Sequence, residues 1–301
     1  MTLKDKTLRW RPEPYKAGRN SLGLRNREIV EKGKQFRILF LEDSLVQMGE
    51  ASSGKLYMVV VEENLNKLRN DTQREIEIIN AGILGYTTYQ ELEFLKIYGL
   101  HMKPDMVILC FVFNDVYYKY LHNLKRWDPE ILLNRFDKKS GIGPLFLRSY
   151  LAHLFVYSLD RIKWRMAKAK GCPNYQFNYT MDFYLAWKDY GWREAQKLIG
   201  EMNDILKCEK IKFAIIVFPI SKQMDTSLIR YDKGYLFYPN KKIVSIAEKY
   251  SIPMFDLSDS LLENGGTTLF MDYLHLNRAG NDIVAAELSK YLIGLVKQSA
   301  L

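Results

Sequence analysis

Five short runs of apolar residues, separated by helix-like patterns, constrain the fold of this chain more than any other feature. The runs are 37–41, 76–80, 106–111, 213–218 and 253–256, and the helical patterns lie near 55–70, 88–98, 185–208, 239–250 and 279–297. Strands that are apolar along their whole length and joined by helices are typical of a parallel sheet covered on both faces. The sequence therefore predicts a three-layer α/β/α sandwich around a mainly five-stranded parallel sheet.

The basic residues gather at the N-terminus. Residues 1–37 hold eleven Lys and Arg against four Asp and Glu, which accounts for +7 of the formal net charge of +9. Since the rest of the chain is nearly neutral, it offers no wide basic face of the kind that binds nucleic acid. We divide the chain into a basic N-terminal arm (1–36), interpreted as a solvated lead-in, and a single domain (37–301).

Residues 116–184 interrupt the alternation of strands and helices. This stretch is rich in aromatic residues, and 146–170 has a helical pattern with a basic second half. Two interpretations are open: an extra helical layer packed on the domain, or a lid over a ligand site, because insertions after sheet strands lie where ligands bind.

The composition argues against several classes of protein. The three cysteines are far apart, so they predict neither a disulfide framework nor a zinc site. The N-terminus lacks the apolar core of a signal peptide, and the most apolar stretch, 143–159, is too short and too polar to span a bilayer. We expect a soluble chain, cytoplasmic by default, or extracytoplasmic if an N-terminal anchor has been removed.

Chemically useful residues follow each of the first three predicted strands. Ser44 follows the first on a tight turn that can expose its hydroxyl. Gly82 and Gly85 follow the second and permit close approach of the backbone. Asn114 follows the third and can donate a hydrogen bond from its amide. Because ligands bind at the carboxyl edge of a parallel sheet, we expect these residues to lie near one another.

A further pair lies close to the C-terminus, where Asp272 precedes His275 by three residues. A carboxylate at this spacing can orient the imidazole ring and stabilise its protonated form. Each of these elements alone is a weak signal. Their joint order along one predicted sheet is the informative observation.

This ordered set resembles the SGNH (GDSL-type) hydrolase family over about residues 20–295. Residues 38–45 are similar to the block that carries the nucleophilic serine, 80–88 to the glycine block, 113–115 to the asparagine block and 272–275 to the final Asp-x-x-His block. The resemblance implies a flavodoxin-like sheet and a carboxylic ester hydrolase that cleaves an acetyl or short-chain acyl ester. It implies neither a metal ion nor an organic cofactor.

The resemblance also assigns roles to individual residues. Ser44 would form a covalent acyl-serine intermediate, with His275 as its base and Asp272 as the acid that orients His275. The oxyanion hole would combine the backbone N–H groups of Ser44 and Gly85 with the side-chain amide of Asn114. A small-molecule or carbohydrate acyl ester would be the substrate.

Two departures from the family pattern bear on activity. The family usually has Gly at the positions of Glu42 and Val112. If the carboxylate of Glu42 faced the site, it would disfavour a developing oxyanion. The neighbouring acids Asp43 and Asp115 are interpreted as structural groups that tie the turns together.

Other functions remain open at this stage. The same fold could serve as a catalytically weak or inactive binding protein, and Glu42 is the main support for that reading. A polysaccharide O-acyltransferase would use the same residues as the hydrolase. A nucleic-acid binder is disfavoured because no matching motif is present, and a membrane-surface role for 146–170 is disfavoured because amphipathic helices usually face a core.

Overall fold

The computed structural model describes residues 2–45, 49–69, 74–116, 162, 166, 184–187 and 189–297. The predicted insertion at 116–184 falls almost wholly outside these residues. Its two interpretations, an extra layer or a lid, therefore stay predictions.

A sheet of five parallel strands forms the centre of the domain, in the order β4-β3-β5-β6-β7. The strands are β3 (Phe36–Glu42), β4 (Ile76–Gly82), β5 (Met106–Phe111), β6 (Lys212–Val217) and β7 (Met254–Asp256). All five match the predicted apolar runs to within two residues, and the strand order is that of a flavodoxin-like sheet. The predicted fold class is confirmed.

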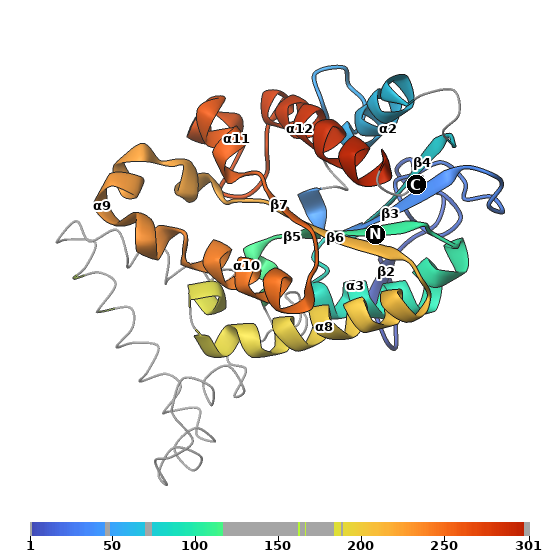
Figure 1. The fold of residues 1–301 in the computed structure, drawn as a ribbon, viewed down its shortest axis with the longest axis horizontal. Coiled ribbons are helices and arrows are strands. Elements are labelled where there is room, and N and C mark those ends of the chain that lie inside the picture. Colours follow the sequence, from blue (N-terminus) through green and yellow to red (C-terminus); the bar gives the residue numbers. More distant parts are fainter. Residues whose placement is uncertain are drawn as a thin grey trace, which may run out of the picture.

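Helices cover both faces of this sheet (Figure 1). One face carries α2 (Tyr57–Leu68), α11 (Ser258–Glu263) and α12 (Arg278–Lys297), and the other carries α3 (Thr88–Phe94), α8 (Trp192–Cys208) and α10 (Tyr238–Tyr250). Because the strands are covered on both sides, every residue of β3, β4 and β5 is buried. This double coverage explains why the strands are apolar throughout rather than alternating.

The remaining elements are shorter. Helix α9 (Thr226–Leu236) and α11 were not predicted from the sequence. The π-helical turn η1 (Leu95–Gly99) continues α3. Among the described residues, 3-10 turns occur at η2 (Leu100–Met102), η3 (Phe113–Val116), η5 (Tyr184–Trp187), η6 (Asp189–Gly191), η7 (Ser221–Met224) and η8 (Gly266–Leu269).

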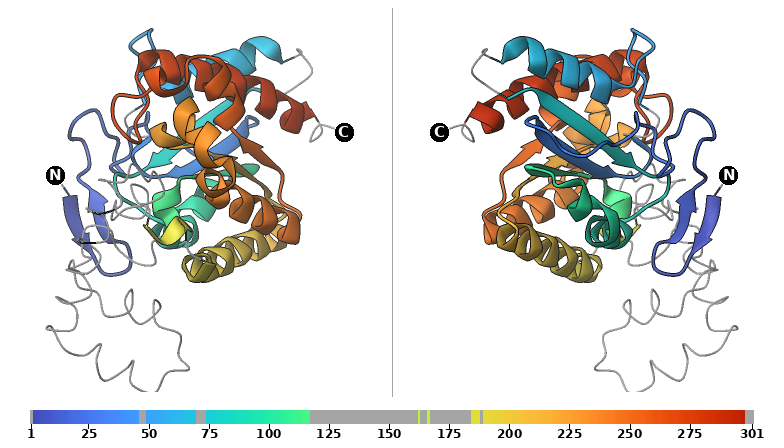
Figure 2. Two further views of the ribbon diagram at one scale, coloured as in Figure 1. Left: turned by 90° about the vertical axis from the view of Figure 1, so that its left-hand side faces the viewer. Right: turned by 90° about the vertical axis from the view of Figure 1, so that its right-hand side faces the viewer.

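The N-terminal arm differs from the expected solvated lead-in. It begins with an antiparallel hairpin of β1 (Thr2–Asp5) and β2 (Arg9–Pro12), which stands at one flank of the domain (Figure 2). Leu8 and Leu24 have no exposed surface, so the arm contributes to the core. The apolar residues among its charges explain the difference, because they are too few to give a periodic signal but enough to anchor the segment.

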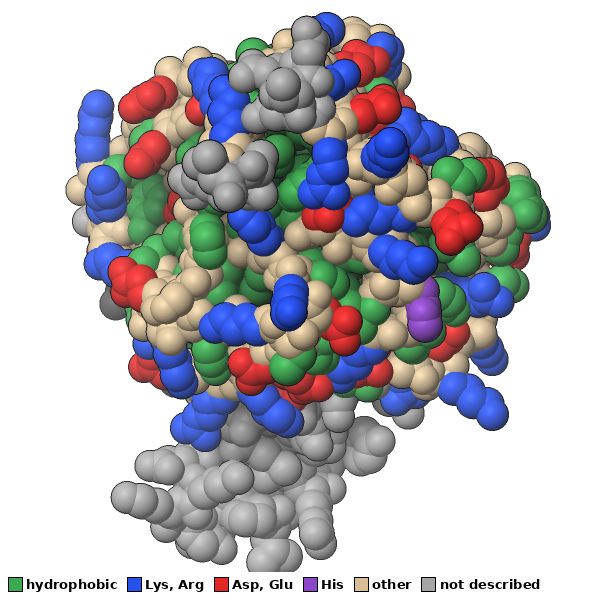
Figure 3. Space-filling model, turned by 45° about the vertical axis from the view of Figure 1, so that its right-hand side comes forward, with side chains coloured by type: hydrophobic (Ala, Val, Ile, Leu, Met, Phe, Trp, Pro, Cys, Tyr) green, Lys and Arg blue, Asp and Glu red, His purple; other side chains and the backbone are tan. Residues whose placement is uncertain are grey.

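Several basic residues of the arm form ion pairs with the body of the domain. Arg25 pairs with Glu50 at 2.9 Å, and Lys32 pairs with Asp105 at 2.6 Å. On the face shown in Figure 3, Lys and Arg side chains are interspersed with Asp and Glu. The ion pairs of Arg25 and Lys32 therefore neutralise part of the positive charge of the arm locally. Within the part of the chain that the structure describes, no helix has both the length and the apolarity needed to cross a membrane.

The buried ion pair between Arg37 and Glu77 fixes the start of the sheet. Arg37 on β3 is 1% exposed, and its Nε donates to Glu77 on β4 at 2.7 Å. Its other guanidinium nitrogens donate to the carbonyl oxygens of Met102 and Val30. Burial alone would raise the pKa of Glu77, but the hydrogen bonds from Arg37 and Gln35, together with the positive charges of Arg37 and Arg27, lower the pKa below its ordinary value.

We predict that Arg37→Ala destabilises the protein strongly, because it leaves the Glu77 carboxylate and two carbonyl groups without their buried partner. The free energy of unfolding should fall by about 3–5 kcal/mol in urea titrations. The exposed pair of Lys55 and Glu63 serves as the control, and Lys55→Ala should cost less than about 1 kcal/mol. Equal losses in the two variants would contradict the role given to Arg37.

Candidate active site

Three side chains predicted from distant parts of the sequence lie in one hydrogen-bonded chain. The Oγ atom of Ser44 is 2.8 Å from Nε2 of His275, and Nδ1 of His275 is 2.8 Å from Oδ2 of Asp272. A carboxylate next to Nδ1 favours the tautomer with hydrogen on that nitrogen, which leaves Nε2 free to accept the Ser44 hydroxyl proton. The arrangement is that of a nucleophile, a base and an orienting acid.

The loop before α12 holds the acid and the histidine together. The second oxygen of Asp272 accepts the backbone N–H groups of Leu274 at 2.8 Å and His275 at 2.7 Å. The N–H of Met271 donates to the carbonyl of His275 at 2.8 Å, which closes the loop from the other side. Asp272 therefore fixes both the ring of His275 and the backbone that carries it.

These hydrogen bonds set the charge of Asp272. Partial burial alone would raise its pKa, but the bonds from the backbone and ring of His275 and from the Leu274 N–H lower the pKa below its ordinary value. The carboxylate thus remains ionised well into acidic solution and can stabilise a protonated imidazole. Its side chain is 45% exposed and that of His275 is 21% exposed, whereas Ser44 is 4% exposed. Within the described residues, the site is most open on the side of Asp272 and His275.

Asp43 joins the serine turn to the end of β5. One of its oxygens accepts the N–H groups of Ser44 and Leu45, and the other accepts the amide of Asn114 at 2.6 Å. An amide NH₂ group has two hydrogens, so this contact orients Asn114 and leaves its second N–H available.

The carboxylate of Asp43 also affects the predicted oxyanion hole, through the backbone N–H of Ser44. The N–H of Ser44 is directed at the Asp43 carboxylate in this structure, so it is already engaged by a protein group. A ligand oxygen would have to share this hydrogen with Asp43. Among the described residues, Gly85 and Asn114 are therefore the predicted donors that still have a hydrogen to offer.

Gly85 lies in the turn that follows β4. The N–H of Tyr86 donates to the carbonyl of Ile83 at 3.0 Å, and Gly85 has a φ of +75°. This combination is typical of a type II turn, whose third residue favours glycine. The turn lies next to the serine turn because the N–H of Ile83 donates to the carbonyl of Glu42 at 2.9 Å.

Asp115 fastens the turn that carries Asn114. Its Oδ2 accepts the N–H of Val112 at 2.8 Å, and its own N–H donates to the carbonyl of Val112 at 2.9 Å. Val112 itself has no exposed surface. Its side chain is therefore accommodated in the core at the position where the family usually has glycine.

Glu42 is fully buried at the end of β3. Its Oε1 accepts the N–H of Leu45 at 3.1 Å, so the carboxylate lies at the start of the turn that follows Ser44. It is also close enough to Tyr57 on α2 and Cys110 on β5 to influence both: burial, followed by neighbouring negative charge that includes Glu42, raises the pKa of each group. Side chains alternate along a strand, and Leu39 lies against Gly99 on the α3 side of the sheet, so Glu42, three residues further on, faces the α2 layer. The buried thiol of Cys110 stays neutral.

A further acid, Glu91 on α3, lies beside this network. It is 1% exposed, and neither of its carboxyl oxygens has a hydrogen-bond partner among the described residues. Burial, with the charges of Asp115 and Asp43, raises its pKa well above 4.5, and burial with the charge of Asp43 raises the pKa of Asp115. We infer that Glu91 carries a proton at neutral pH, because an ionised carboxylate without partners would be costly at this depth.

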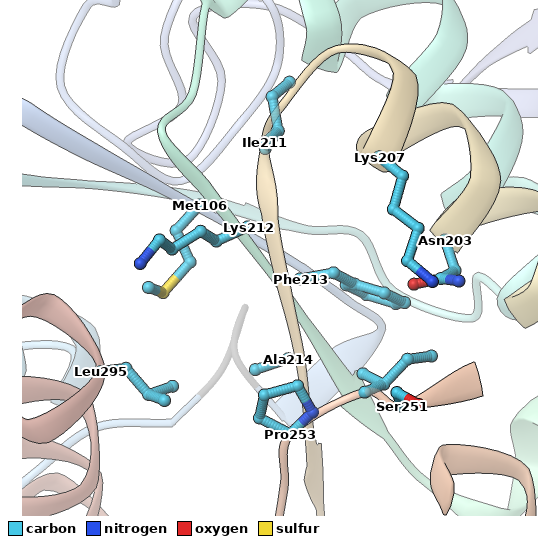
Figure 4. A pocket seen from close by; sticks show the side chains of 11 residues that line it. Met106, Asn203, Lys207, Ile211, Lys212, Phe213, Ala214, Ser251, Pro253 and Leu295 are labelled. Atoms are coloured by element: carbon cyan, nitrogen blue, oxygen red, sulfur yellow. The ribbon is translucent and has the colours of Figure 1, made fainter. Parts of the chain in front are cut away.

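A pocket of about 280 Å³ lies at the opposite edge of the sheet (Figure 4). Met106 and Lys212, which begin β5 and β6, line it together with Pro253. This position separates it from the carboxyl edge that carries Ser44. Among the described residues, no cluster of three or more His, Cys, Asp or Glu is arranged to hold a metal ion.

Sequence reasoning found the strand-end residues but missed Glu91 and the partners of the Gly85 turn. A Glu in the first turn of a helix is usually exposed, so Glu91 gave no signal. Trp10 and Tyr86 are 76 residues apart and make contact only through the folded hairpin. The tryptophan in the charge-rich arm gave no signal of this contact, because nothing local in the sequence links it to Tyr86.

Neither a protein-family model nor a curated protein sequence matches the chain. Among solved structures, two variants of an acetyl-xylooligosaccharide esterase from Geobacillus stearothermophilus are similar, with TM-scores of 0.51 and 0.50 and identities of 15% and 16%. Each match covers 87% of this chain and 95% of the other. A lipase/acylhydrolase from Enterococcus faecalis is similar with a TM-score of 0.48 and 17% identity, over 86% of this chain and 95% of the other. At these identities the likeness to the two esterase variants shows the α/β fold.

The buried acids predict how stability depends on pH. A carboxyl group whose pKa is raised by folding binds its proton more tightly in the native state, so its stabilising contribution is complete below the ordinary pKa and is lost as pH rises. We predict that Glu91→Gln, which keeps the shape of the protonated acid, makes this loss shallower above pH 4.5. In urea titrations at pH 5–8, the free energy of unfolding of Glu91→Gln should fall less steeply with pH than that of the wild-type protein. The two slopes should differ by up to about 1.4 kcal/mol per pH unit.

The matched control for this variant is Glu209→Gln, because Glu209 is exposed at the C-terminal end of α8. The control should keep the slope of the wild-type protein. If the free energy of unfolding changed with pH in the same way in the wild-type protein and in Glu91→Gln, Glu91 would not be a protonated acid in the native state.

Proposed function

We propose that this chain is a serine hydrolase of the SGNH type that cleaves acyl esters through a covalent acyl-serine intermediate. The observation that carries the proposal is the hydrogen-bonded chain of Ser44, His275 and Asp272, with both contacts at 2.8 Å. The fold supports it further, because the solved structures that share this fold include esterases.

In the first half of the reaction, the Ser44 hydroxyl attacks the ester carbonyl. His275 accepts the hydroxyl proton at Nε2 and then donates it to the leaving alcohol as the tetrahedral intermediate collapses. Asp272 holds the ring through Nδ1 and stabilises its positive charge. The acyl group remains on Ser44 as an ester.

In the second half, water takes the place of the alcohol. His275 removes a proton from the water, which attacks the acyl-serine carbonyl, and returns that proton to Ser44 Oγ as the acid leaves. In both halves, negative charge develops on the carbonyl oxygen. The N–H of Gly85 and the second amide hydrogen of Asn114 would stabilise it, and the Ser44 N–H would join them by sharing its hydrogen with Asp43.

The substrate we propose is an acetyl or short-chain acyl ester of a carbohydrate or another small alcohol. Two observations support this class. The similar solved structures include an acetyl-xylooligosaccharide esterase, and Ser44 is nearly buried while Asp272 and His275 are more exposed. A nearly buried nucleophile leaves little room for a bulky acyl group.

The central test is Ser44→Ala with p-nitrophenyl acetate and longer-chain esters as substrates. Loss of the nucleophile should lower kcat/KM at least about 1,000-fold. The control is Ser289→Ala, which removes a buried hydroxyl that donates to the Ala285 carbonyl within α12 and should keep wild-type kinetics. Undiminished turnover by Ser44→Ala would overturn the assignment, and acyl transfer to an added sugar would identify an acyltransferase instead.

The position of Glu42 yields a second prediction for activity. Because its carboxylate accepts the Leu45 N–H and faces the α2 layer, Glu42→Gln should change kcat less than about threefold. Glu42→Gly should lower the melting temperature, because it leaves the Leu45 N–H without this acceptor and opens a cavity. A rise in kcat above tenfold in Glu42→Gly would instead show that Glu42 inhibits the site.

A further inference from the structure

The N-terminal hairpin forms hydrogen bonds with the turn that carries Gly85. The indole Nε1 of Trp10 donates to the carbonyl oxygen of Leu84 at 3.3 Å, and the hydroxyl of Tyr86 donates to the carbonyl oxygen of Trp10 at 2.8 Å. The two rings also pack edge to face, with their centroids 5.7 Å apart. The residues on both sides of Gly85 are therefore held by the same residue of β2.

The contact continues into α3. The side-chain amide of Gln90 donates to the carbonyl oxygen of Leu8 at 2.9 Å, while its oxygen accepts the N–H of Thr87 at 3.3 Å. Leu8 has no exposed surface and Trp10 is 8% exposed. The bonds of Tyr86 and Gln90 are buried, whereas the bond from Trp10 to Leu84 is part-buried and the side chain of Leu84 is 47% exposed. The buried bonds hold the hairpin against the turn.

The bond from Trp10 has a particular geometric consequence. The carbonyl of Leu84 and the N–H of Gly85 belong to one planar trans peptide group, so they point in opposite directions. Fixing the carbonyl toward the hairpin therefore fixes the N–H on the other edge of the plane. A hydrogen bond to the carbonyl also polarises the peptide and makes its N–H a better donor.

We propose that Trp10 is a positioning residue for catalysis: its indole N–H holds the Leu84–Gly85 peptide plane so that the Gly85 N–H serves the oxyanion. This inference rests on the proposed function, because it gives Gly85 its role as a donor. It assigns to the N-terminal hairpin a part in the chemistry as well as in the core. The Ile83 N–H, bonded to the carbonyl of Glu42 at 2.9 Å, holds the same turn from the side of β3.

The test compares two variants that each remove one hydrogen bond from the same interface. Trp10→Phe removes the bond to the Leu84 carbonyl, and Tyr86→Phe removes the bond to the Trp10 carbonyl. Removing an oxyanion donor typically costs roughly 100- to 1,000-fold in kcat, so loss of its orientation should cost part of that, about tenfold. We expect Trp10→Phe to lower kcat about tenfold with KM little changed, and Tyr86→Phe to lower kcat less than about threefold.

Equal losses of kcat in the two variants, in proportion to their losses of melting temperature, would show that the interface is only structural. Wild-type kcat in a folded Trp10→Phe protein would also overturn the proposal. If Trp10→Phe does not fold, site-specific replacement of Trp10 by β-(3-benzothienyl)alanine removes the N–H and keeps the ring shape. A tenfold loss of kcat in that protein would then support the proposal, and wild-type kcat would overturn it.

A second readout separates this proposal from the proposed function. In ¹⁵N-labelled protein, loss of the indole N–H should shift the amide resonance of Gly85 more than that of Ile83, whether or not the protein hydrolyses esters. If Ser44→Ala keeps full activity but the Gly85 resonance shifts as expected, the proposed function fails while the positioning contact stands. An unchanged Gly85 resonance in Trp10→Phe would refute the contact itself.

Discussion

The site depends first on the carboxylate of Asp43, which links two strands that are adjacent in the sheet. It accepts the N–H groups of Ser44 and Leu45 at the end of β3 and the amide of Asn114 just after β5. A carboxylate offers several acceptor positions and no donor, so it can gather N–H groups from separate turns. Asp43 thereby ties the serine turn to the asparagine turn.

The surrounding turns are held in the same way, each by a different neighbour. Asp115 fastens its own turn through Val112, and Asp272 fastens the loop of His275. The turn of Gly85 is held from β3 by the Glu42 carbonyl and from the flank by Trp10. The accumulation of buried acids near one serine is tolerated because most of these oxygens accept N–H groups, while Glu91, which has no such partner, is best accommodated as a neutral acid.

The sequence predicted much of the fold because buried parallel strands give unbroken apolar runs that are easy to recognise. It predicted the grouping of Ser44, Asn114 and the Gly85 turn because strands of a parallel sheet end at the same edge. It did not predict the hairpin, since β1 and β2 are four residues each and gain their stability from partners more than 70 residues away. The direction of Glu42 was not predicted either, because the Leu45 N–H that its carboxylate accepts is brought there by the folded turn.

The central claim is that Ser44 is an activated nucleophile, and covalent labelling tests it most directly. The protein would be treated with a fluorophosphonate probe, its intact mass measured, and the modified peptide sequenced by mass spectrometry. We predict one added probe per chain, located on Ser44, and labelling that is slowed in His275→Ala. No adduct at high probe concentration, or an adduct on another serine, would contradict it.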